Sequence, residues 1–308
     1  MTENTIPSLH LIANTRSGRG NGPVVVETAR RLCQEAGIRF VHHDTSEKGS
    51  FDRRIEAAVS AALEDQGVVA AAGGDGTIRA VAQKAHGKNV KFAVIPCGTF
   101  NFFARNHRIP EDIEAALRLA LTGQTRAVRL GSVNGEVFLI NASLGLYAKA
   151  IREREDRTSR WGRRRLIVIL STLMSLLEGH RLLRVDLETN KVTRQVRTPM
   201  LFIGNNALQL RNLSLNVAHC MKQDLLAVVT MKPGGIWDTI RLIFHGLIRR
   251  LENADNLESF CVDSLTIHTR RPVQSVALDG EMFHMTSPLN VISLPRVLNM
   301  VLPPLEGN

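Results

Sequence analysis

The stretch GVVAAAGGDGT, residues 67–77, decides the fold of this chain. Its first six residues are small and apolar, which is typical of a strand buried on both faces. The glycine-rich turn after it leads into a helical pattern over 77–86. Short apolar runs and helical patterns alternate on both sides of this stretch, between residues 8 and 121. Such alternation predicts an α/β region whose parallel sheet carries helices on both faces.

The remaining elements of this first region follow from the same patterns. Strands are expected at 8–13, 38–43, 67–72 and 90–96, and helices at 23–36, 51–64, 77–86 and 111–121. In a parallel sheet of this kind, ligands bind beyond the carboxyl ends of the strands. The loops that follow the strands are therefore the places to look for chemistry.

From about residue 124 the alternation of strands and helices gives way to short strands joined by tight turns. These strands are expected at 128–133, 137–143, 182–188, 192–198, 200–205, 225–231, 260–269 and 273–278. The pair Asn134-Gly135 is a strong hairpin signal between two of them. We expect a mainly antiparallel β domain with helical insertions near 145–179 and 236–252. The boundary falls near residue 125, so the domains are 1–125 and 126–308, with the apolar segment 289–302 a candidate to return to the first.

The composition fits a folded globular protein that meets an anionic partner. Of the 308 residues 44% are hydrophobic and 22% are charged, and the formal net charge is +10. Nucleic acid, anionic lipid and phosphorylated cofactors all suit such a charge. Aromatic residues make up only 5% of the chain and include a single tyrosine, which leaves little material for stacking on bases. Nucleic acid is therefore not expected as a partner.

The cysteines and the apolar runs bear on the cellular compartment. Cys33, Cys97, Cys220 and Cys261 are far apart and form no CxxC pair, so neither a zinc site nor a disulfide framework is expected. A reducing interior is then the default compartment. The first residues lack a basic region before their apolar stretch, unlike a signal peptide. The longest apolar run, 166–177, is shorter than the about 20 residues that span a bilayer.

The turn GGDGT, residues 73–77, has the residue types of a phosphate site. Its glycines let the backbone approach a polyphosphate, and the helix behind it offers unpaired amides and a positive dipole end. Thr77 can cap that helix or bind phosphate, and Asp75 can hold a metal or accept a proton. An ordinary turn with an N-cap is the plain alternative. Five such residues directly after a buried strand favour the phosphate site.

Two further loops follow strands on the same edge of the predicted sheet. NTRSGRG, residues 14–20, combines small hydroxyl residues, glycines and arginines, but it lacks the Walker spacing. Taken alone it reads as a solvated turn, and its position beside GGDGT favours phosphate binding. PCGTFNFFARN, residues 96–106, places a hydroxyl and an amide before an apolar and basic helical turn. A helix start with core phenylalanines is the alternative there.

Four motifs together resemble the diacylglycerol kinase catalytic family, which includes bacterial lipid kinases and is related to sphingosine and ceramide kinases. PCGTFNFFAR at 96–105 is similar to its P-x-G-T-x-N-x-F-A-R, and Asn14, Ser17, Gly18 and Gly20 match its N-x-x-S-G-x-G. LDGE at 278–281 is similar to its late motif. GGDGT is its signature, although NAD kinases and phosphofructokinase relatives share it. The resemblance spans nearly the whole chain.

The resemblance implies an ATP-dependent lipid kinase with an active site in a cleft between the two domains. Phosphoryl transfer needs a magnesium nucleotide, an aligned hydroxyl and a carboxylate that accepts its proton. Asp279 and Asp75 are the candidates for that carboxylate, and Glu281 is a candidate contact for substrate, nucleotide or metal. Asp75 is also the candidate ligand for nucleotide-bound Mg²⁺. The expected nucleotide contacts are Asn14, Thr15, Arg16, Ser17, Gly18, Thr45, Gly73, Gly74, Asp75, Gly76, Thr77, Thr99 and Asn101.

The chain departs from the family pattern at three places. Many relatives carry an aspartate where Phe102 and Tyr147 stand here. Relatives often support a structural magnesium with a D-x-G-x-L stretch, and at 221–224 only Asp224 could contribute to it. These departures argue against a second metal site. They also argue against a carboxylate network or a metal role at Phe102 and Tyr147.

Two segments suit docking on an anionic membrane. Seven arginines lie between residues 152 and 165, directly before the apolar run 166–177, and segment 236–251 alternates apolar residues with arginines. Each basic residue near an anionic surface contributes about 1 kcal/mol. Helices that pack on the core and solvate their arginines are the alternative for each segment. With a lipid substrate, we expect a cytoplasmic protein that associates peripherally with membranes.

Two other functions stay open on the sequence alone. A kinase of the NAD kinase type would share GGDGT, although the segment 96–105 favours lipid. A non-catalytic regulator that binds lipid or nucleotide is suggested by the departures at Phe102 and Tyr147. The sequence does not name the lipid, which can be diacylglycerol-like or sphingoid, and it leaves a homodimer open.

Overall fold

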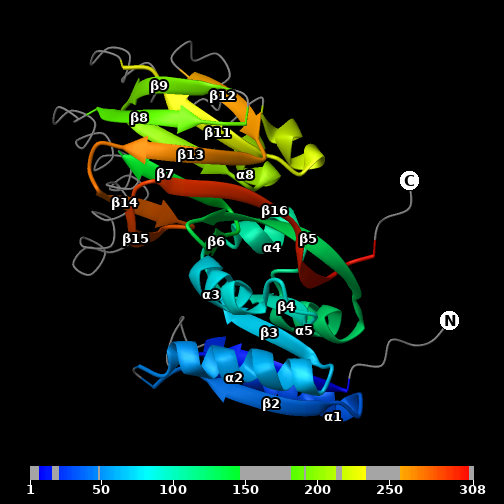
Figure 1. Ribbon diagram of the computed structural model, residues 1–308. Helices are drawn as coiled ribbons and strands as arrows, with labels where there is room; N and C mark the ends of the chain where they lie inside the picture. The colour runs from blue at the N-terminus through cyan, green and yellow to red at the C-terminus, as the bar shows by residue number, and fades with distance from the viewer. Residues whose placement is uncertain are drawn as a thin grey trace. The chain divides into compact units, whose positions relative to one another are not determined.

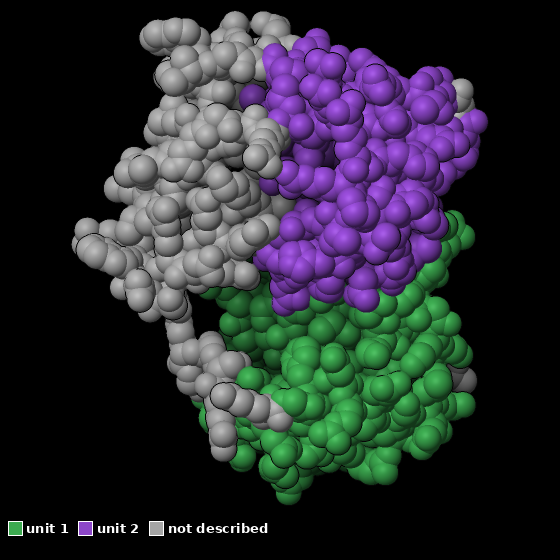
Figure 2. Space-filling view, turned by 60° about the vertical axis from the view of Figure 1, so that its left-hand side comes forward, with its two compact units in different colours: residues 1–130, 295–308 green, residues 131–294 purple. Residues whose placement is uncertain are grey.

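The computed structural model describes residues 7–15, 21–47, 49–145, 182–190, 192–212, 217–233 and 257–304. The chain forms two compact units (Figure 2), one of residues 1–130 and 295–308, the other of residues 131–294. The expected helical insertions and both basic, apolar segments fall on 146–181 and 234–256, outside the described residues. Among the described residues no helix is both long and apolar enough to cross a membrane.

The first unit is built on a parallel sheet. Its four leading strands lie in the order β2-β1-β3-β4, and all three pairings between neighbours are parallel. Their bounds are β1 (Ser8–Ala13), β2 (Arg39–Asp44), β3 (Val68–Gly73) and β4 (Lys91–Pro96). The last part of β16 (Leu289–Leu302) extends this sheet beside β4, where Met300 lies opposite Phe92. β1 and β3 are almost wholly buried, as the apolar runs predicted.

Helices cover both faces of this sheet (Figure 1). α2 (Phe51–Glu64) and α3 (Asp75–Ala85) pack together on one face, and α1 (Asn21–Glu35) packs with α5 (Ile113–Thr122) on the other. The buried residues of α2 are Ile55, Ala58, Val59 and Ala62, the spacing that places apolar side chains on one side of a helix. Asp112 caps α5 by accepting a hydrogen bond from the amide of Ala115 at 2.8 Å.

The second unit is an antiparallel sandwich. One sheet has the order β12-β11-β10-β7-β14-β15, and the other contains β9, β8, β13 and the first part of β16. The bounds are β7 (Asn141–Gly145), β8 (Leu183–Glu188), β9 (Thr193–Thr198), β10 (Met200–Gly204), β11 (Leu226–Met231), β12 (Leu257–Val262), β13 (Ser264–Thr269), β14 (Val273–Leu278) and β15 (Glu281–Thr286). Their buried residues, such as Leu144 and Val228 from one sheet with Leu265 and Val291 from the other, form one core.

The predicted fold class is confirmed, and most predicted strands and helices agree with the structure within a few residues. β5 (Gln124–Val133) and β6 (Glu136–Phe138) form the hairpin expected at Asn134-Gly135. Three elements were not predicted: β15, the short helix α8 (Ala207–Asn212) and the 3-10 helix η1 (Ala218–Gln223). The short helix α4 (Phe102–Asn106) follows β4, where a helical turn was expected.

Two predicted strands are each divided in the structure. The run 137–143 becomes β6 and β7, because the amides of residues 139–141 bind a carboxylate instead of a neighbouring strand. The run 260–269 becomes β12 and β13, which belong to different sheets. The chain changes sheets at Asp263, whose carboxylate accepts a hydrogen bond from the amide of Ser264 at 2.7 Å. Neither break is visible in the apolar pattern of the sequence.

The expectation of no disulfide is wrong for one pair of cysteines. Cys220 of η1 and Cys261 of β12 form a disulfide whose Cα atoms lie 5.5 Å apart. They are separated by 41 residues, and it is the pairing of β11 with β12 that brings them together. Cys33 and Cys97 are free. Spacing along the chain could not reveal this contact, because it depends on strand register.

Candidate active site

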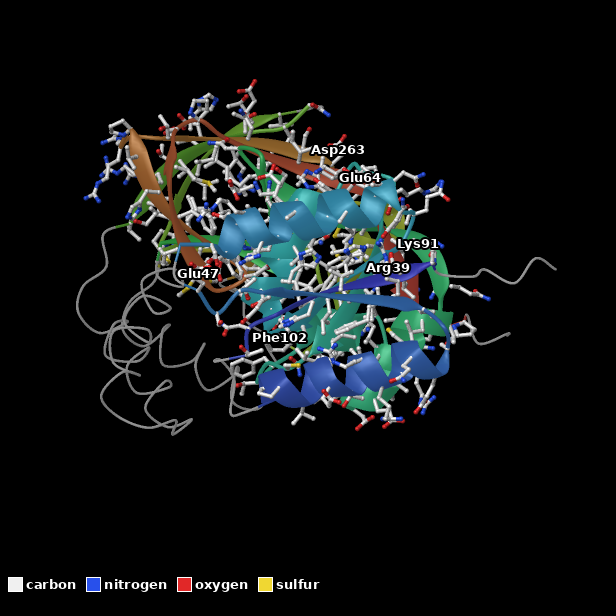
Figure 3. All side chains as sticks on the ribbon, turned by 90° about the horizontal axis from the view of Figure 1, so that it is seen from below. Arg39, Glu47, Glu64, Lys91, Phe102 and Asp263 are labelled. Atoms are coloured by element: carbon white, nitrogen blue, oxygen red, sulfur yellow. A yellow bond between two sulfur atoms is a disulfide. The ribbon has the colours of Figure 1, made fainter. Side chains whose placement is uncertain are left out.

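The loops after β3 and β4 lie directly against each other at the carboxyl end of the parallel sheet. The amide of Cys97 donates to the carbonyl oxygen of Gly73 at 2.9 Å. A Cβ atom on Gly98 would lie 2.7 Å from the Cα atom of Gly74, so these two backbones approach more closely than any side chain allows. Figure 3 shows Phe102 at this end of the sheet, while Arg39 and Lys91 mark the opposite end.

The GGDGT loop forms the start of α3, as the sequence predicted. Gly74 is the N-cap residue, and no side chain caps this end of the helix. The first amides of a helix lack partners within it, so this end can bind an anion. A Cβ atom on Gly73 would lie 2.6 Å from Cβ of Thr77, so only glycine fits beneath that threonine. Gly76 lies between them in the first turn.

Asp75 is the carboxylate of this loop, and it is partly buried. Its two oxygen atoms accept hydrogen bonds from the amides of Phe102 at 3.3 Å and Phe103 at 3.2 Å. Burial raises the pKa of Asp75, although these two bonds act in the opposite direction. Asp75 is therefore a better proton acceptor than an ordinary aspartate, and it also joins the loop after β3 to the start of α4.

The loop after β4 is held by an unusual backbone conformation. Asn101 adopts the left-handed region with φ of 49°, and it is buried. Its side-chain oxygen accepts a hydrogen bond from the amide of Gly98 at 3.0 Å. Thr99 lies between them and is exposed. Phe102 stacks on exposed Phe100 with ring centroids 5.6 Å apart.

The loops after β1 and β2 share a carboxylate that the sequence analysis did not single out. Asp44 accepts hydrogen bonds from the hydroxyl of Thr15 at 3.2 Å and from the hydroxyl of Ser46 at 2.8 Å. Burial alone would raise the pKa of Asp44, but the bonds from Ser46 and Thr15 outweigh it and lower that pKa. An acidic residue at the end of a predicted strand, followed by two hydroxyl residues, was the available signal.

Thr45 is buried, and its hydroxyl oxygen has no hydrogen-bond partner. A buried hydroxyl without a partner is costly, which points to a partner supplied by a ligand. Gly22 at the start of α1 packs on the loop after β1, because a Cβ atom there would lie 2.5 Å from the carbonyl oxygen of Asn14. Arg16, Ser17 and Gly18, three predicted contacts, fall outside the described residues.

In the second unit, Asp279 is bonded to backbone amides through both oxygen atoms. It accepts hydrogen bonds from Leu139 at 2.7 Å, Ile140 at 2.8 Å and Asn141 at 3.0 Å, and its own amide donates to the carbonyl oxygen of Asn141 at 2.9 Å. Asp279 and Gly280 both have positive φ, at 50° and 96°, as in a tight hairpin turn. This turn joins β14 to β15, and partly exposed Glu281 begins β15.

Several buried polar side chains surround residues 139–141, the segment whose amides Asp279 binds. The side-chain amide of Asn141 donates to the side-chain oxygen of Gln209 at 3.1 Å, and that of Asn205 donates to the carbonyl oxygen of Leu139 at 3.1 Å. The side-chain oxygen atoms of Asn141 and Ser143 are buried without a partner. Asn141 and Ser143 are alternate residues of β7 and lie on the same face of its sheet. Sequence reasoning missed Gln209 and Asn205, which belong to no motif.

The described residues offer a limited set of metal ligands. Their only group of three or more histidine, cysteine or acidic ligands is His219, Cys220 and Cys261. No cluster of carboxylates in the described ranges forms a cage for Mg²⁺. Magnesium often binds through one or two carboxylates plus substrate phosphates, and Asp75 can supply one such carboxylate. The site therefore fits a metal that arrives with a nucleotide.

Comparisons with known proteins agree with the motifs. Residues 8–133 match the family model of the diacylglycerol kinase catalytic domain. A relative named "Probable lipid kinase YegS-like" in Klebsiella pneumoniae (strain 342) is 34% identical over 149 residues, which are 48% of each chain. One of the same name in Yersinia pestis (strain Pestoides F) is 35% identical over 150 residues, 47% of this chain and 49% of that one. The match thus spans about half the length of these relatives.

A solved structure extends the likeness of fold to nearly the whole chain. The crystal structure of a diacylglycerol kinase from Bacillus anthracis str. Sterne superposes with a TM-score of 0.69. The superposition covers 97% of this chain and 97% of that one, at 17% sequence identity. At this identity the similarity establishes the fold of both units and leaves their chemistry to the residues.

Proposed function

Because residues 8–133 match the family model of the diacylglycerol kinase catalytic domain, we propose that this chain belongs to that family and is an ATP-dependent lipid kinase. It transfers the γ-phosphate of Mg-ATP to a hydroxyl group of a membrane lipid, which is diacylglycerol-like or sphingoid. Relatives named as lipid kinases support this assignment. The lipid-type segment PCGTFNFFAR supports lipid over a soluble acceptor such as NAD.

One observation carries the proposal: the contact of Gly74 with Gly98 at an uncapped helix end. The two glycines bring two loops together without side chains between them. The phosphates of a nucleotide can then lie against backbone amides at the start of α3. Thr45 supports the same site, because its buried hydroxyl lacks a partner in the protein. Phosphoryl transfer depends mainly on such positioning and electrostatic stabilisation.

We assign the proton transfer to Asp75 and a positioning role to Asp279. Asp75 has a pKa raised by burial, so it accepts a proton more readily than an ordinary aspartate. Asp279 accepts hydrogen bonds from three backbone amides, which occupy both of its oxygen atoms in holding the chain. Its hydrogen bonds hold residues 139–141 in place. These residues in turn contact the buried polar side chains of Asn205 and Gln209 in the second unit. Glu281 is then a contact for the lipid or the nucleotide.

Bound magnesium would neutralise charge on the phosphates as the phosphoryl group moves. Asp75 is the acidic residue of the loop 73–77, so instead of accepting the proton it could bind the magnesium ion of the nucleotide. The two roles predict different results for Asp75→Asn. Loss of a base removes the acid limb of the pH–rate profile, whereas loss of a ligand raises the Mg²⁺ concentration needed for half-maximal rate.

The acceptor lipid brings the protein to a membrane surface, and we propose peripheral association with an anionic membrane in the cytoplasm. The net charge of +10 supports attraction to such a surface. Vesicle flotation with and without anionic lipid measures it. Equal binding to neutral vesicles at moderate salt would contradict the electrostatic part.

The deciding experiment is phosphate transfer in mixed micelles. Purified protein is incubated with γ-labelled ATP, Mg²⁺ and a lipid extract, and labelled lipids are identified by mass spectrometry. We expect a labelled lipid with the wild type and none with Asp75→Asn. A parallel reaction with NAD tests the alternative acceptor. Transfer to NAD but to no lipid would replace the proposal, and transfer to neither would favour a non-catalytic binding protein.

A further inference from the structure

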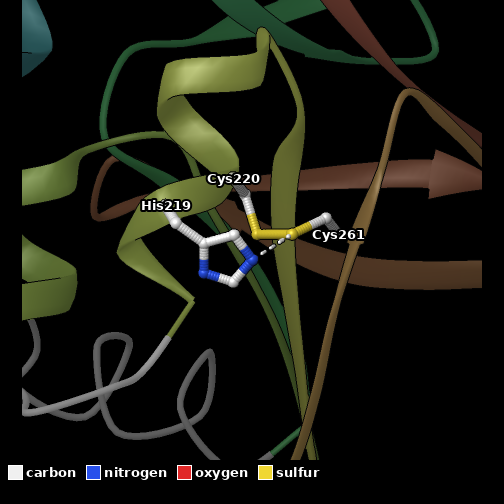
Figure 4. A group of neighbouring side chains, drawn as sticks. All are labelled: His219, Cys220 and Cys261. Atoms are coloured by element: carbon white, nitrogen blue, oxygen red, sulfur yellow. Dashed lines mark hydrogen bonds between the residues drawn. A yellow bond between two sulfur atoms is a disulfide. The ribbon is translucent and has the colours of Figure 1, made fainter.

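The Cys220–Cys261 disulfide lies in the second unit, at a place no motif of the proposed kinase explains (Figure 4). It ties η1, which follows α8 along the chain, to β12 at the edge of the six-stranded sheet. Cys220 is fully buried and packs in an apolar cluster with Leu210 and Val217. Cys261 is partly exposed. The two sulfur atoms of one bond therefore have unequal access to solvent.

A histidine lies beside the accessible sulfur. Nε2 of His219 is 3.4 Å from Sγ of Cys261, and the imidazole of His219 is directed toward the disulfide (Figure 4). His219 itself is exposed. A nearby imidazolium stabilises a thiolate, which makes that thiolate both a better leaving group and a more abundant nucleophile. Buried structural disulfides lack such a neighbour and such access.

We propose that Cys220, Cys261 and His219 form a reversible thiol–disulfide exchange site for small dithiol reductants. Access favours Cys261 as the sulfur that the reductant attacks, and the histidine favours it as the sulfur that leaves in the second step and attacks during reoxidation. The other two cysteines are unsuited to this chemistry, because burial raises the pKa of Cys33 and of Cys97 to about 11. The chain therefore has one pair built for exchange and two inert thiols.

The exchange proceeds in two steps. A thiolate of the reductant attacks Sγ of Cys261, a mixed disulfide forms there, and Cys220 leaves as a thiolate. Exposed His219, with a ring nitrogen within 4.8 Å of that sulfur, passes it a proton from solvent. The second thiolate of the reductant then attacks its own sulfur in the mixed disulfide. Cys261 leaves as a thiolate next to His219, which supplies its proton. Two electrons pass to the protein, and the reductant ends as a cyclic disulfide.

Reduction of the disulfide would affect residues 139–141, the segment held by Asp279, through a series of direct contacts. Cys220 packs in the same cluster as Leu210 of α8. The preceding residue, Gln209, holds the side chain of Asn141, whose amide donates to Asp279. Releasing η1 from β12 therefore loosens the anchor of Asn141. If the proposed function is right, reduction lowers the rate of lipid phosphorylation.

The first test counts thiols and does not depend on kinase activity. The protein is equilibrated in a series of dithiothreitol buffers of increasing reducing potential and then quenched in acid. It is denatured in the presence of a chelator, its free thiols are alkylated, and the adducts are counted by mass spectrometry. The chelator prevents a metal on the same three donor atoms, which lie within 4.8 Å of one another, from masking thiols. We expect two adducts in the oxidised protein and four in the reduced protein, with a reversible transition. Four adducts without reductant would overturn the proposal.

The second test measures the role of the histidine. His219→Gln should slow reduction and reoxidation roughly threefold or more, because the Cys261 thiolate loses its stabilising neighbour. His284→Gln, at another exposed histidine of the same unit, is the matched control and should leave both rates unchanged. Equal rates in the two variants would refute the role of His219. Kinase rates of the oxidised and reduced wild type are compared separately, so that a lack of kinase activity leaves the thiol result interpretable.

Discussion

Asp279→Asn tests whether this carboxylate is an anchor or a base. In the wild type, one oxygen atom accepts from Leu139 at 2.7 Å and the other accepts from Ile140 at 2.8 Å and Asn141 at 3.0 Å. Asparagine keeps a single acceptor oxygen, which can serve the latter two amides. Its NH₂ group would then face the amide of Leu139, and two donors would oppose each other.

The size of the effect follows from these contacts. An unsatisfied buried donor costs about 1–3 kcal/mol, and the two remaining bonds lose their charge assistance, at roughly 0.5–1 kcal/mol each. Because Asp279 is partly exposed, we take about 2–4 kcal/mol for the free energy that holds residues 139–141 in place. At 1.4 kcal/mol per tenfold change, hydrogen exchange of these amides should accelerate by roughly 30-fold to several-hundred-fold.

The assay is hydrogen exchange with mass spectrometry on the peptide that covers residues 137–145. Glu281→Gln is the matched control, since it removes the same charge two residues away and should leave exchange in this peptide unchanged. The phosphorylation rate is measured on both variants. Normal protection in Asp279→Asn, together with a rate loss of two or more orders of magnitude, would refute the anchoring role and identify Asp279 as the proton acceptor.

Three further predictions address the first unit. Gly98→Ala places a Cβ atom 2.7 Å from the Cα atom of Gly74 and should separate the two loops, which weakens ATP binding at least about tenfold by calorimetry and costs about 1–3 kcal/mol of stability. Thr45→Val removes a buried hydroxyl without a partner, so thermal shift assays should show an equal or higher Tm without ATP and a smaller rise with ATP. Asp75 has a raised pKa, so its charged form costs stability above the folded-state pKa, and this cost disappears as the pH falls through that value. Asp75→Asn removes this cost but turns an NH₂ group toward the amide of Phe102 or Phe103, so it should lower the Tm less at pH 7 than at acid pH while it abolishes transfer, and a loss of Tm that grows toward pH 7 would contradict this reasoning.

Local sequence patterns predicted the elements that depend on near neighbours. The alternation of apolar strands and helices predicted the parallel sheet, and residues 67–77 predicted a buried strand, a glycine-rich turn and the start of a helix. The pair Asn134-Gly135 predicted the hairpin of β5 and β6, because only certain residues adopt positive φ at such a turn. Each of these signals lies within a few residues of the structure that it predicts.

The loops of the proposed site in the first unit could be placed for the same reason. Motif residues follow directly after strands, and the carboxyl ends of parallel strands meet at one edge. This placed the loops after β1, β3 and β4 at one edge of the sheet. It did not reveal Asp44, which acts through hydrogen bonds to Thr15 and Ser46 across two loops.

Tertiary structure alone decided the partners of groups far apart in the chain. Asp279 binds amides that precede it by 138 to 140 residues, and this contact divides an apolar run that reads as one strand. Cys220 and Cys261 meet only through the register of β11 and β12. The physical reason is that strand register and burial choose these pairs from many residues of equal local propensity. By itself the sequence determined the parallel sheet and the loops at its edge, and packing determined which backbone amides Asp75 and Asp279 each bind.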